Sequence, residues 1–272
     1  MPRIAPRTTL RSISLFSSVF ATSSGNTTNP KMDPIIRNYT PKNPNGAFPY
    51  SKADLTPTEA GHDASFYTIP RFVTHIDDNA IVNLRKYYDQ VLPRKGRILD
   101  FCSSWISHYP PDLAKATESG DLEVLGTGMN KSELSQNPIL KAWSVQDLNE
   151  DPKLRLPGDS STTSGEDEPK LIDAATCVVS IDYLTQPVEV LGSIRQQTTT
   201  GGKVHLIISN RCFPTKVVGR WLKVDEAQRL DMVGDYLWWS GWRNIEIQTL
   251  VEASWTKDPL WVVRAENTVG AQ

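Results

Sequence analysis

The chain has 272 residues, of which 39% are hydrophobic and 22% charged, and its composition is that of a globular protein with a net charge of −2. Residues 1–58 hold seven Lys and Arg against two acids, whereas the remainder holds 22 against 29. This acidic remainder lacks the basic surface that non-specific binding to nucleic acid requires, so we expect no nucleic-acid partner. No segment approaches the ~18 consecutive apolar residues of a membrane span. The three cysteines are odd in number and widely spaced, which indicates neither a disulfide framework nor a metal site.

The first 32 residues contain several arginines, many Ser and Thr, and no Asp or Glu. This composition is typical of a mitochondrial transit peptide, in which Arg7 and Arg11 would lie opposite an apolar helical face. A secretory signal is one alternative, because residues 19–21 form an acceptable cleavage site, and a disordered tail is another. We therefore expect a mitochondrial protein, with a cytoplasmic one as the alternative.

The stretch 33–65 is rich in Pro, Asn and Gly, which predicts either an extended linker or a wrap over the domain surface. A folded domain is expected at residues 66–267. Within this domain, residues 157–170 are too hydrophilic to pack and predict a surface insertion.

The folded part is expected to begin with a helix capped by Asp77 or Asp78, whose carboxylates can accept backbone N–H bonds in the first turn. Strands and helices then alternate. Strands are expected at 97–101, 123–130 (with a terminal loop), 143–148, 174–181 and 203–209, and helices at 111–119, 131–136, 188–197 and 217–239. Residues 198–202 predict a tight turn, and 244–252 and 259–266 a terminal antiparallel hairpin. This alternation predicts an α/β fold with a mostly parallel sheet and helices on both faces.

The stretch 97–110, RILDFCSSWISHYP, is typical of a first strand that runs into a ligand-binding turn, because an apolar run ends in Asp100 and small polar residues follow. Ligands of open α/β sheets bind at the carboxyl ends of the strands. A dinucleotide dehydrogenase would carry G-x-G-x-x-G at this turn, and a short-chain dehydrogenase would carry Tyr-x-x-x-Lys; the chain has neither. An adenosyl cofactor has no pyrophosphate and needs no close glycine cradle. The missing glycines therefore favour an adenosyl cofactor over NAD.

Six short motifs, in order, carry a resemblance to a known family. They are HIDDNAI (75–81), LDFCSSW (99–105), GMNKSEL (128–134), VQDLN (145–149), SIDYLTQP (180–187) and SNRCFPTK (209–216), with Gly-Gly at 201–202 and Gly-Trp at 241–242. On these motifs, residues 66–264 resemble the class I S-adenosylmethionine-dependent methyltransferases, and more narrowly a type-11-like group of fungi, plants and cyanobacteria. The resemblance implies a Rossmann-like, seven-stranded sheet into which the last hairpin inserts an antiparallel strand. It also implies S-adenosylmethionine at the carboxyl ends of the first four strands.

The expected cofactor-binding residues follow those four strands: Asp100, Phe101, Cys102, Ser103, Met129, Asn130, Gln146, Asp147, Leu148, Ser180, Ile181 and Asp182. The expected catalytic residues are His75, Tyr183 and Asn210, and the expected substrate-binding residues are Arg71, Tyr183 and Arg211. The chain departs from the family pattern twice. FCSSW replaces the glycine-rich turn, and Asn130 stands where an acid would bind both ribose hydroxyls.

Several of these residues have a plainer alternative role. Asp100 and Asp147 could cap turns, and the acids beside His75 could cap a helix next to an incidental histidine. Asp182 and Tyr183 could form an exposed turn. Arg71 and Arg211 could hold an anionic substrate or the cofactor carboxylate, or could be ordinary surface arginines. The tryptophans at 221, 238, 239 and 242 could line an aromatic pocket or belong to the core.

The sequence thus predicts methyl transfer from S-adenosylmethionine to a small-molecule acceptor. The first alternative is a non-catalytic, methyltransferase-like interaction or assembly protein, which the missing glycines and Asn130 motivate. The second is an NAD-dependent dehydrogenase. The sequence indicates no oligomeric state.

Overall fold

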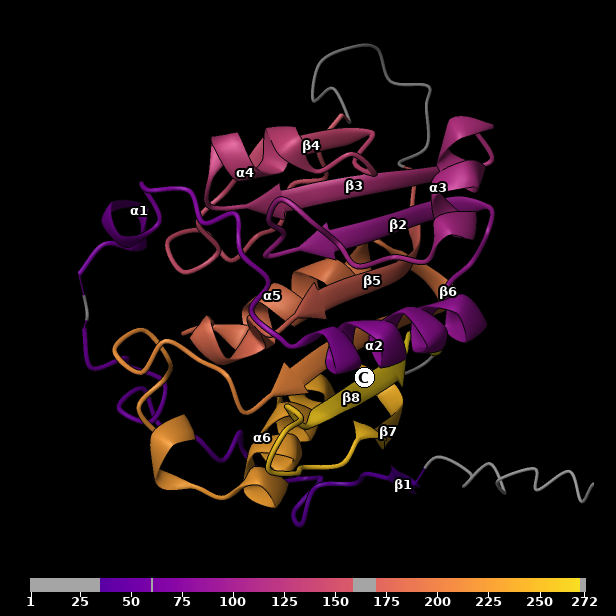
Figure 1. The fold of residues 1–272 in the computed structure, drawn as a ribbon. Coiled ribbons are helices and arrows are strands. Elements are labelled where there is room, and N and C mark those ends of the chain that lie inside the picture. The colour runs from indigo at the N-terminus through magenta and orange to yellow at the C-terminus, as the bar shows by residue number, and fades with distance from the viewer. Residues whose placement is uncertain (1–34, 60, 159–169, 270–272) are drawn as a thin grey trace, which may run out of the picture. The chain divides into compact units, whose positions relative to one another are not determined.

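A computed structural model describes residues 35–59, 61–158 and 170–269 (Figure 1). The predicted transit peptide and nearly all of the predicted insertion lie outside these residues. Among the described helices, none has both the length and the apolar character needed to cross a bilayer.

A single sheet organises the described part of the chain, and its strand order is β1-β7-β8-β6-β5-β2-β3-β4. The strands are β1 (Ile36–Asn38), β2 (Gly96–Phe101), β3 (Leu122–Gly128), β4 (Ala142–Val145), β5 (Ile172–Val178), β6 (Thr198–Ser209), β7 (Arg243–Val251) and β8 (Leu260–Glu266). Strands β4, β3, β2, β5 and β6 are parallel, and β8 lies between β6 and β7, antiparallel to both. The predicted α/β class and the inserted antiparallel strand are confirmed. The predicted number of seven strands is wrong by one within the described residues, because β1 adds an eighth strand along β7.

Helices cover both faces of the sheet, as the sequence predicts. Helix α2 (Asp78–Val91) and α3 (Pro111–Glu118) pack on one face, and α5 (Pro187–Gln196) and α6 (Glu226–Trp239) pack on the other. In Figure 1, α2 crosses in front of the sheet and α5 and α6 lie behind it. The short helices α1 (Asp63–Phe66) and α4 (Lys131–Gln136) lie at the sheet's carboxyl edge.

Helix α2 begins where its sequence provides a cap. The Asp77 carboxylate accepts a hydrogen bond of 2.7 Å from the backbone N–H of Ala80, so Asp77, one of the two expected residues, is the N-cap. The residues that the helix buries recur at helical spacing, which fixes the face turned to the sheet: Ala80, Ile81, Leu84, Tyr87 and Tyr88.

Helix α6 begins later than expected. The sequence predicts a helix over 217–239, but the first part is a 3₁₀ turn at Trp221–Lys223. The side chain of Asp225 accepts a bond from the backbone of Gln228, and the Gln228 side chain accepts one from the backbone of Asp225. This capping box starts the helix at Glu226.

The expected turn at 198–202 is instead a bulge inside β6. Ile172 pairs with Thr198 whereas Ala174 pairs with Lys203, so the residues between them on β6 leave the register. Gly201 in this bulge has φ +82°, a conformation that glycine adopts without steric cost.

Residues 35–59, here called the strap, run over α6. The strap lies within residues 33–65, which the sequence predicts as a linker or a wrap. The hydroxyls of Tyr39 and Tyr50 donate to the two carboxylate oxygens of Asp235, at 2.5 and 2.6 Å. Gly234 allows this approach, because a Cβ there would lie 2.5 Å from Tyr39 Cδ1. The indole N–H groups of Trp238 and Trp239 donate to strap carbonyls. The two remaining tryptophans that the sequence suggested for an aromatic pocket, Trp221 and Trp242, are both buried in the core. None of these four tryptophans, at 221, 238, 239 and 242, lines the cavity described below.

Candidate ligand-binding site

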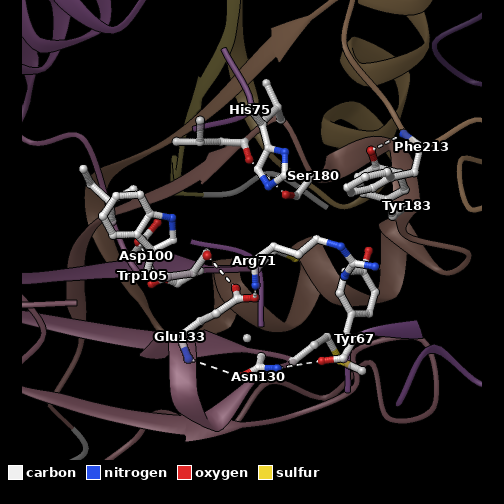
Figure 2. A pocket seen from close by; sticks show the side chains of 18 of the residues that line it. Tyr67, Arg71, His75, Asp100, Trp105, Asn130, Glu133, Ser180, Tyr183 and Phe213 are labelled. Carbon is white, nitrogen blue, oxygen red and sulfur yellow. Dashed lines mark hydrogen bonds between the residues drawn. The ribbon is translucent and has the colours of Figure 1, made fainter. Parts of the chain in front are cut away.

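A cavity of about 580 Å³ lies across the carboxyl ends of β2, β3, β4 and β5. Its size is within the range of about 300–1,000 Å³ typical of small-molecule sites. Residues 63–77, here called the roof segment, cover it together with the 211–213 loop. Figure 2 shows two residues of the roof segment beside residues that follow β3: Arg71 lies next to Glu133, and Tyr67 lies next to Asn130. The position agrees with the rule that ligands of open α/β sheets bind at the carboxyl ends of strands.

Asp100 is the penultimate residue of β2 and is almost completely buried at the cavity wall. Its Oδ2 accepts bonds of 2.6 Å from both Ser103 Oγ and Ser107 Oγ, and its Oδ1 accepts one of 3.2 Å from Thr176 Oγ1. Burial raises the pKa of this carboxyl, and the three hydroxyls oppose the rise. Asp100 therefore braces the turn after β2 in addition to lining the cavity.

Strained backbone is concentrated around the cavity. Of the four described non-glycine residues with positive φ, three line it: Cys102 (φ +53°), His108 (φ +57°) and Val179 (φ +44°). A left-handed conformation costs a residue with a Cβ on the order of 1–2 kcal/mol. Cys102 thus keeps a conformation that glycine would adopt freely, although the glycines expected after β2 are missing.

Glycine is retained where space demands it, at Gly128. A Cβ at this position would lie 2.1 Å from the Ser103 carbonyl oxygen, so only glycine lets the turn after β2 approach the end of β3. The backbone N–H of Ser103 donates to Thr127 across the same contact, at 2.7 Å.

Asn130 is fully occupied by contacts within the chain. Its Oδ1 accepts bonds from the backbone N–H groups of Ser132 and Glu133, which caps α4. Its Nδ2 donates to the carbonyl oxygens of Tyr67 and Thr68, at 2.7 and 3.2 Å, which ties down the roof segment (Figure 2). An aspartate could make the first pair of bonds but not the second, because a carboxylate has no N–H to donate. This explains an asparagine where the family pattern has an acid.

Glu133 is a buried carboxylate of the cavity wall that the sequence analysis did not select. It accepts bonds from the backbone N–H of Arg71 at 2.7 Å and from Ser104 Oγ at 2.5 Å. A carboxylate can accept about four hydrogen bonds, so Glu133 retains capacity for a ligand hydroxyl. It lies three residues after Asn130, inside the quoted motif GMNKSEL.

Gln146 and Asp147 follow β4 and differ in their availability. The Gln146 side chain donates to two carbonyls of the following loop and accepts from Arg155, so it holds that loop. Asp147 is half-buried and caps the turn by accepting from the backbone N–H of Asn149 at 2.9 Å. Desolvation by burial raises the pKa of Asp147. Its remaining acceptor capacity is open to the cavity that it lines.

Tyr183, Phe213 and His75 form an aromatic side of the cavity. The Tyr183 hydroxyl accepts a bond of 2.8 Å from the backbone N–H of Phe213, and burial raises the pKa of this phenol far above its ordinary value. The His75 ring lies edge-on to Phe213, 5.6 Å between ring centroids. His75 is exposed at the cavity mouth, and partial desolvation by its neighbours lowers its pKa from 6.5. It is therefore uncharged at neutral pH.

Two arginines line the cavity and differ in their partners. Arg211 is exposed and pairs with Asp258, 2.9 Å between Nε and Oδ1. The Arg71 guanidinium lies over the Phe66 ring, 4.5 Å from its centroid, and Arg71 Nη2 donates to the Phe66 carbonyl.

The cavity brings together most residues that the sequence predicts for the site. Its lining includes Arg71, His75, Asp100, Cys102, Ser103, Met129, Asn130, Gln146, Asp147, Leu148, Ser180, Tyr183 and Arg211.

Four predicted site residues lie outside the cavity lining: Phe101, Ile181, Asp182 and Asn210. Phe101 and Ile181 are buried in the core, the first because side chains alternate along β2. The chain after β5 turns as a 3₁₀ helix, and the Asp182 side chain is buried there. Asn210 is exposed and accepts from its neighbour Ser209.

Sequence reasoning missed residues whose importance depends on distant parts of the chain. Tyr67, Trp105 and Phe213 line the cavity, yet no local pattern distinguishes them from core aromatics. His108 is also in the lining; its Nδ1 is buried without a described hydrogen-bond partner, and burial lowers its pKa to about 4. In the described ranges, no group of three His, Cys, Asp or Glu side chains is placed to hold a metal ion.

No family model matches the chain, and no curated protein sequence matches it. Several solved structures resemble it. CurJ carbon methyltransferase is 16% identical over 70% of this chain and 54% of its own, with a TM-score of 0.43. Phosphoethanolamine N-methyltransferase 2 of Haemonchus contortus is 13% identical over 69% and 52%, with a TM-score of 0.43. A SAM-dependent methyltransferase from Archaeoglobus fulgidus is 12% identical over 70% and 94%, with a TM-score of 0.45. The chain spans about half the length of the first two.

Proposed function

We propose that this chain is an S-adenosylmethionine-dependent methyltransferase of class I, close to the type-11-like group, and that it acts on a small-molecule acceptor. The observation that carries the proposal is one cavity across the ends of four parallel strands, with carboxylates after β3 and β4. An adenosyl group needs hydrogen-bond acceptors at those two places, for its ribose hydroxyls and its adenine amino group. Glu133 and Asp147 supply them.

The donor set fits S-adenosylmethionine better than a dinucleotide. The turn after β2 carries Cys102 and Ser103, so it offers no glycine cradle for a pyrophosphate. When bound, the cofactor supplies an electrophilic methyl group. The chain's own residues would position the acceptor. The roof segment would exclude water from the cavity, and Tyr183 would orient the acceptor. Uncharged His75 is able to accept a proton from the acceptor.

The test is calorimetric titration with S-adenosylmethionine and S-adenosylhomocysteine. We expect binding, and we expect Asp147→Asn to weaken it by about tenfold, because the new amide N–H₂ would face the adenine amino group. Asp112→Asn, on the exposed first turn of α3, is the matched control and should bind like the parent. Absence of both heat and thermal shift at millimolar ligand would refute the proposal.

A specific observation favours a second candidate, a non-catalytic interaction or assembly protein. The side chains of Asn130 and Gln146 are both committed to holding loops, so two expected cofactor contacts are already in use. This candidate predicts that the protein binds S-adenosylmethionine without transferring its methyl group, or does not bind it at all. Labelled S-adenosylmethionine is incubated with cell extract, with and without the protein. Label that is transferred only when the protein is present excludes the non-catalytic candidate. An NAD-dependent dehydrogenase, the second alternative from the sequence, requires a thermal shift with NAD(H).

The acid-free composition of residues 1–32 supports a further proposal, import into mitochondria. A fusion of residues 1–40 to a fluorescent reporter tests it in cells. Mitochondrial fluorescence is the expected result, and diffuse cytosolic fluorescence would favour the cytoplasmic alternative.

A further inference from the structure

The ionisable side chains of the cavity wall differ in the partners that hold them within the chain. Among the described acids of the wall, Asp63 pairs with Lys216 at 3.2 Å and Asp258 pairs with Arg211 at 2.9 Å. Asp100 and Glu133 accept hydrogen bonds from hydroxyl or backbone donors. The described wall contains two basic side chains, Arg71 and Arg211. Of these two, Arg211 is ion-paired with Asp258, whereas Arg71 makes no ion pair with a described residue.

The Arg71 guanidinium is held in place by groups that do not neutralise it. Its Cζ lies over the rings of Phe66 and Phe213, 4.5 and 5.4 Å from their centroids. Nη2 donates to the Phe66 carbonyl at 3.2 Å, whereas Nη1 is buried without a hydrogen-bond partner among the described residues. A buried donor left unsatisfied is costly, and more so when it carries charge. The arrangement therefore favours a ligand that brings an acceptor to this nitrogen.

The ligand chemistry that fits an arginine fork is a planar anion. Guanidinium and carboxylate form two parallel N–H···O bonds, a geometry that a neutral amide cannot reproduce. The cavity wall also includes four flat rings, those of Tyr67, His75, Tyr183 and Phe213. The ring centroids of Tyr183 and Phe213 are 6.0 Å apart, and the two ring planes are inclined by 35°. Figure 2 shows the Arg71 side chain extending toward Tyr67 on this aromatic side.

We propose that the acceptor of this site is a planar carboxylic acid, most simply an aromatic one, whose carboxylate is bound by Arg71 while its ring packs among Tyr67, Tyr183 and Phe213. This inference rests on the proposed function and specifies its substrate class. S-adenosylmethionine also carries a carboxylate, at its amino-acid end, that an arginine can bind. The experiment therefore distinguishes an acceptor carboxylate from the cofactor's carboxylate.

The experiment titrates two acids, 4-hydroxybenzoate and indole-3-carboxylate, each beside its primary amide. Each probe is added to the free protein and to the protein saturated with S-adenosylhomocysteine. We expect at least one acid to bind about tenfold more tightly than its amide, in line with a charge-assisted pair. Arg71→Met should abolish this preference, and Arg71→Lys should retain part of it because the charge remains. Thermal unfolding of both variants checks that the roof segment still packs.

The cofactor arm compares S-adenosylhomocysteine with 5′-methylthioadenosine, which lacks the amino-acid end. Unchanged affinity of Arg71→Met for S-adenosylhomocysteine supports an acceptor carboxylate. A tenfold loss for S-adenosylhomocysteine, with none for 5′-methylthioadenosine, overturns the inference by assigning Arg71 to the cofactor. Absence of any acid preference in either form of the protein also overturns it. Failure of S-adenosylhomocysteine to bind refutes the proposed function separately, and the titrations of the free protein still report on Arg71.

Discussion

Asp182 lies in the 3₁₀ helix after β5, where burial raises the pKa of its carboxyl from 3.8 to about 7. The folded state therefore binds this proton more tightly than the unfolded chain does. The stability that this group contributes is complete below pH 3.8 and is lost as the pH rises through about 7.

Asp182→Asn removes the charge that burial disfavours. We expect the variant to exceed the parent in free energy of unfolding by up to about 4 kcal/mol at pH 8, with the gain shrinking steadily toward pH 4. Urea unfolding at several pH values measures this difference. An equal gain at pH 4 and pH 8 would show that ionisation is not the cause.

Cys102 provides a second test at the level of single residues, because its φ of +53° penalises bulky and branched side chains. Cys102→Val should lower the free energy of unfolding by about 1–2 kcal/mol. Cys102→Gly should stay within about 1 kcal/mol of the parent, since relief of strain is offset by a more flexible unfolded chain. Urea unfolding of both variants provides the comparison. If valine were tolerated as well as glycine, the left-handed turn would not be maintained in solution.

Among the larger elements, the roof segment depends on side chains that follow β3 and β6. Asn130 is the clearest case, because one amide caps α4 with its oxygen and holds the roof segment with its nitrogen. Asn130→Asp separates these roles. The carboxylate of the variant still caps α4, but it faces the carbonyl oxygens of Tyr67 and Thr68 without an N–H to donate. We expect this to lower the free energy of unfolding by about 1–3 kcal/mol.

Hydrogen exchange can locate that loss. In Asn130→Asp, amide exchange should accelerate in the roof segment while α4 keeps its protection; Asn130→Ala should accelerate both. Equal protection of the roof segment in parent and Asn130→Asp would contradict the role of the two carbonyl bonds.

Lys216 joins the roof segment to the loop after β6. Its side chain is 2% exposed, its Nζ lies 3.2 Å from Asp63 Oδ1, and it donates to the Gly61 carbonyl at 3.1 Å. Asp63 also accepts from Asn149, so the pair connects three segments around the cavity.

Removing only the lysine leaves a partly buried carboxylate without its counter-charge. Lys216→Met should therefore cost about 3 kcal/mol or more of unfolding free energy. Lys216→Met combined with Asp63→Asn should recover at least about 1 kcal/mol, because the unpaired charge is gone. Chemical denaturation of the four proteins of the cycle measures the coupling. Additive effects of the two substitutions would argue against an ion pair.

At the scale of the whole molecule, the sheet and its helices were predictable because each depends on a local signal. The apolar runs of β2, β5 and β6 and the exact bounds of α4 follow from periodicity, turn residues and caps. The start of α6 was also available locally, in the capping box of Asp225 and Gln228. Strand β1 was not predictable, since its three exposed residues acquire meaning only beside β7.

The residues of the site also divide into those that local sequence predicts and those that depend on distant parts of the chain. Residues that follow a strand, such as Cys102 and Asp147, were predictable because parallel strands bring their carboxyl ends to one edge. The hydrogen bonds of Asn130 to the roof segment and the stacking of Arg71 on Phe213 were not predictable, because these partners are distant in sequence. The inward turn of Asp182 depends on one local 3₁₀ helix, which sequence patterns rarely mark.

Strand β1 covers the edge of β7, and an uncovered strand edge invites pairing between molecules. A chain that begins at residue 40 should therefore aggregate at a lower temperature than one that begins at residue 35, which retains β1. Light scattering during a thermal ramp compares the two. Identical aggregation temperatures would mean that β1 does not protect the edge.

The strap also dictates an order of assembly. Tyr39 and Tyr50 bind Asp235 across separations of 196 and 185 residues, so the beginning of the strap has no docking surface until most of the chain exists. Because contacts of such long range form late, the sheet and α6 should assemble first and the strap should close last. During synthesis on the ribosome, the strap would thus remain open to chaperones and translocation machinery after the first strands have emerged.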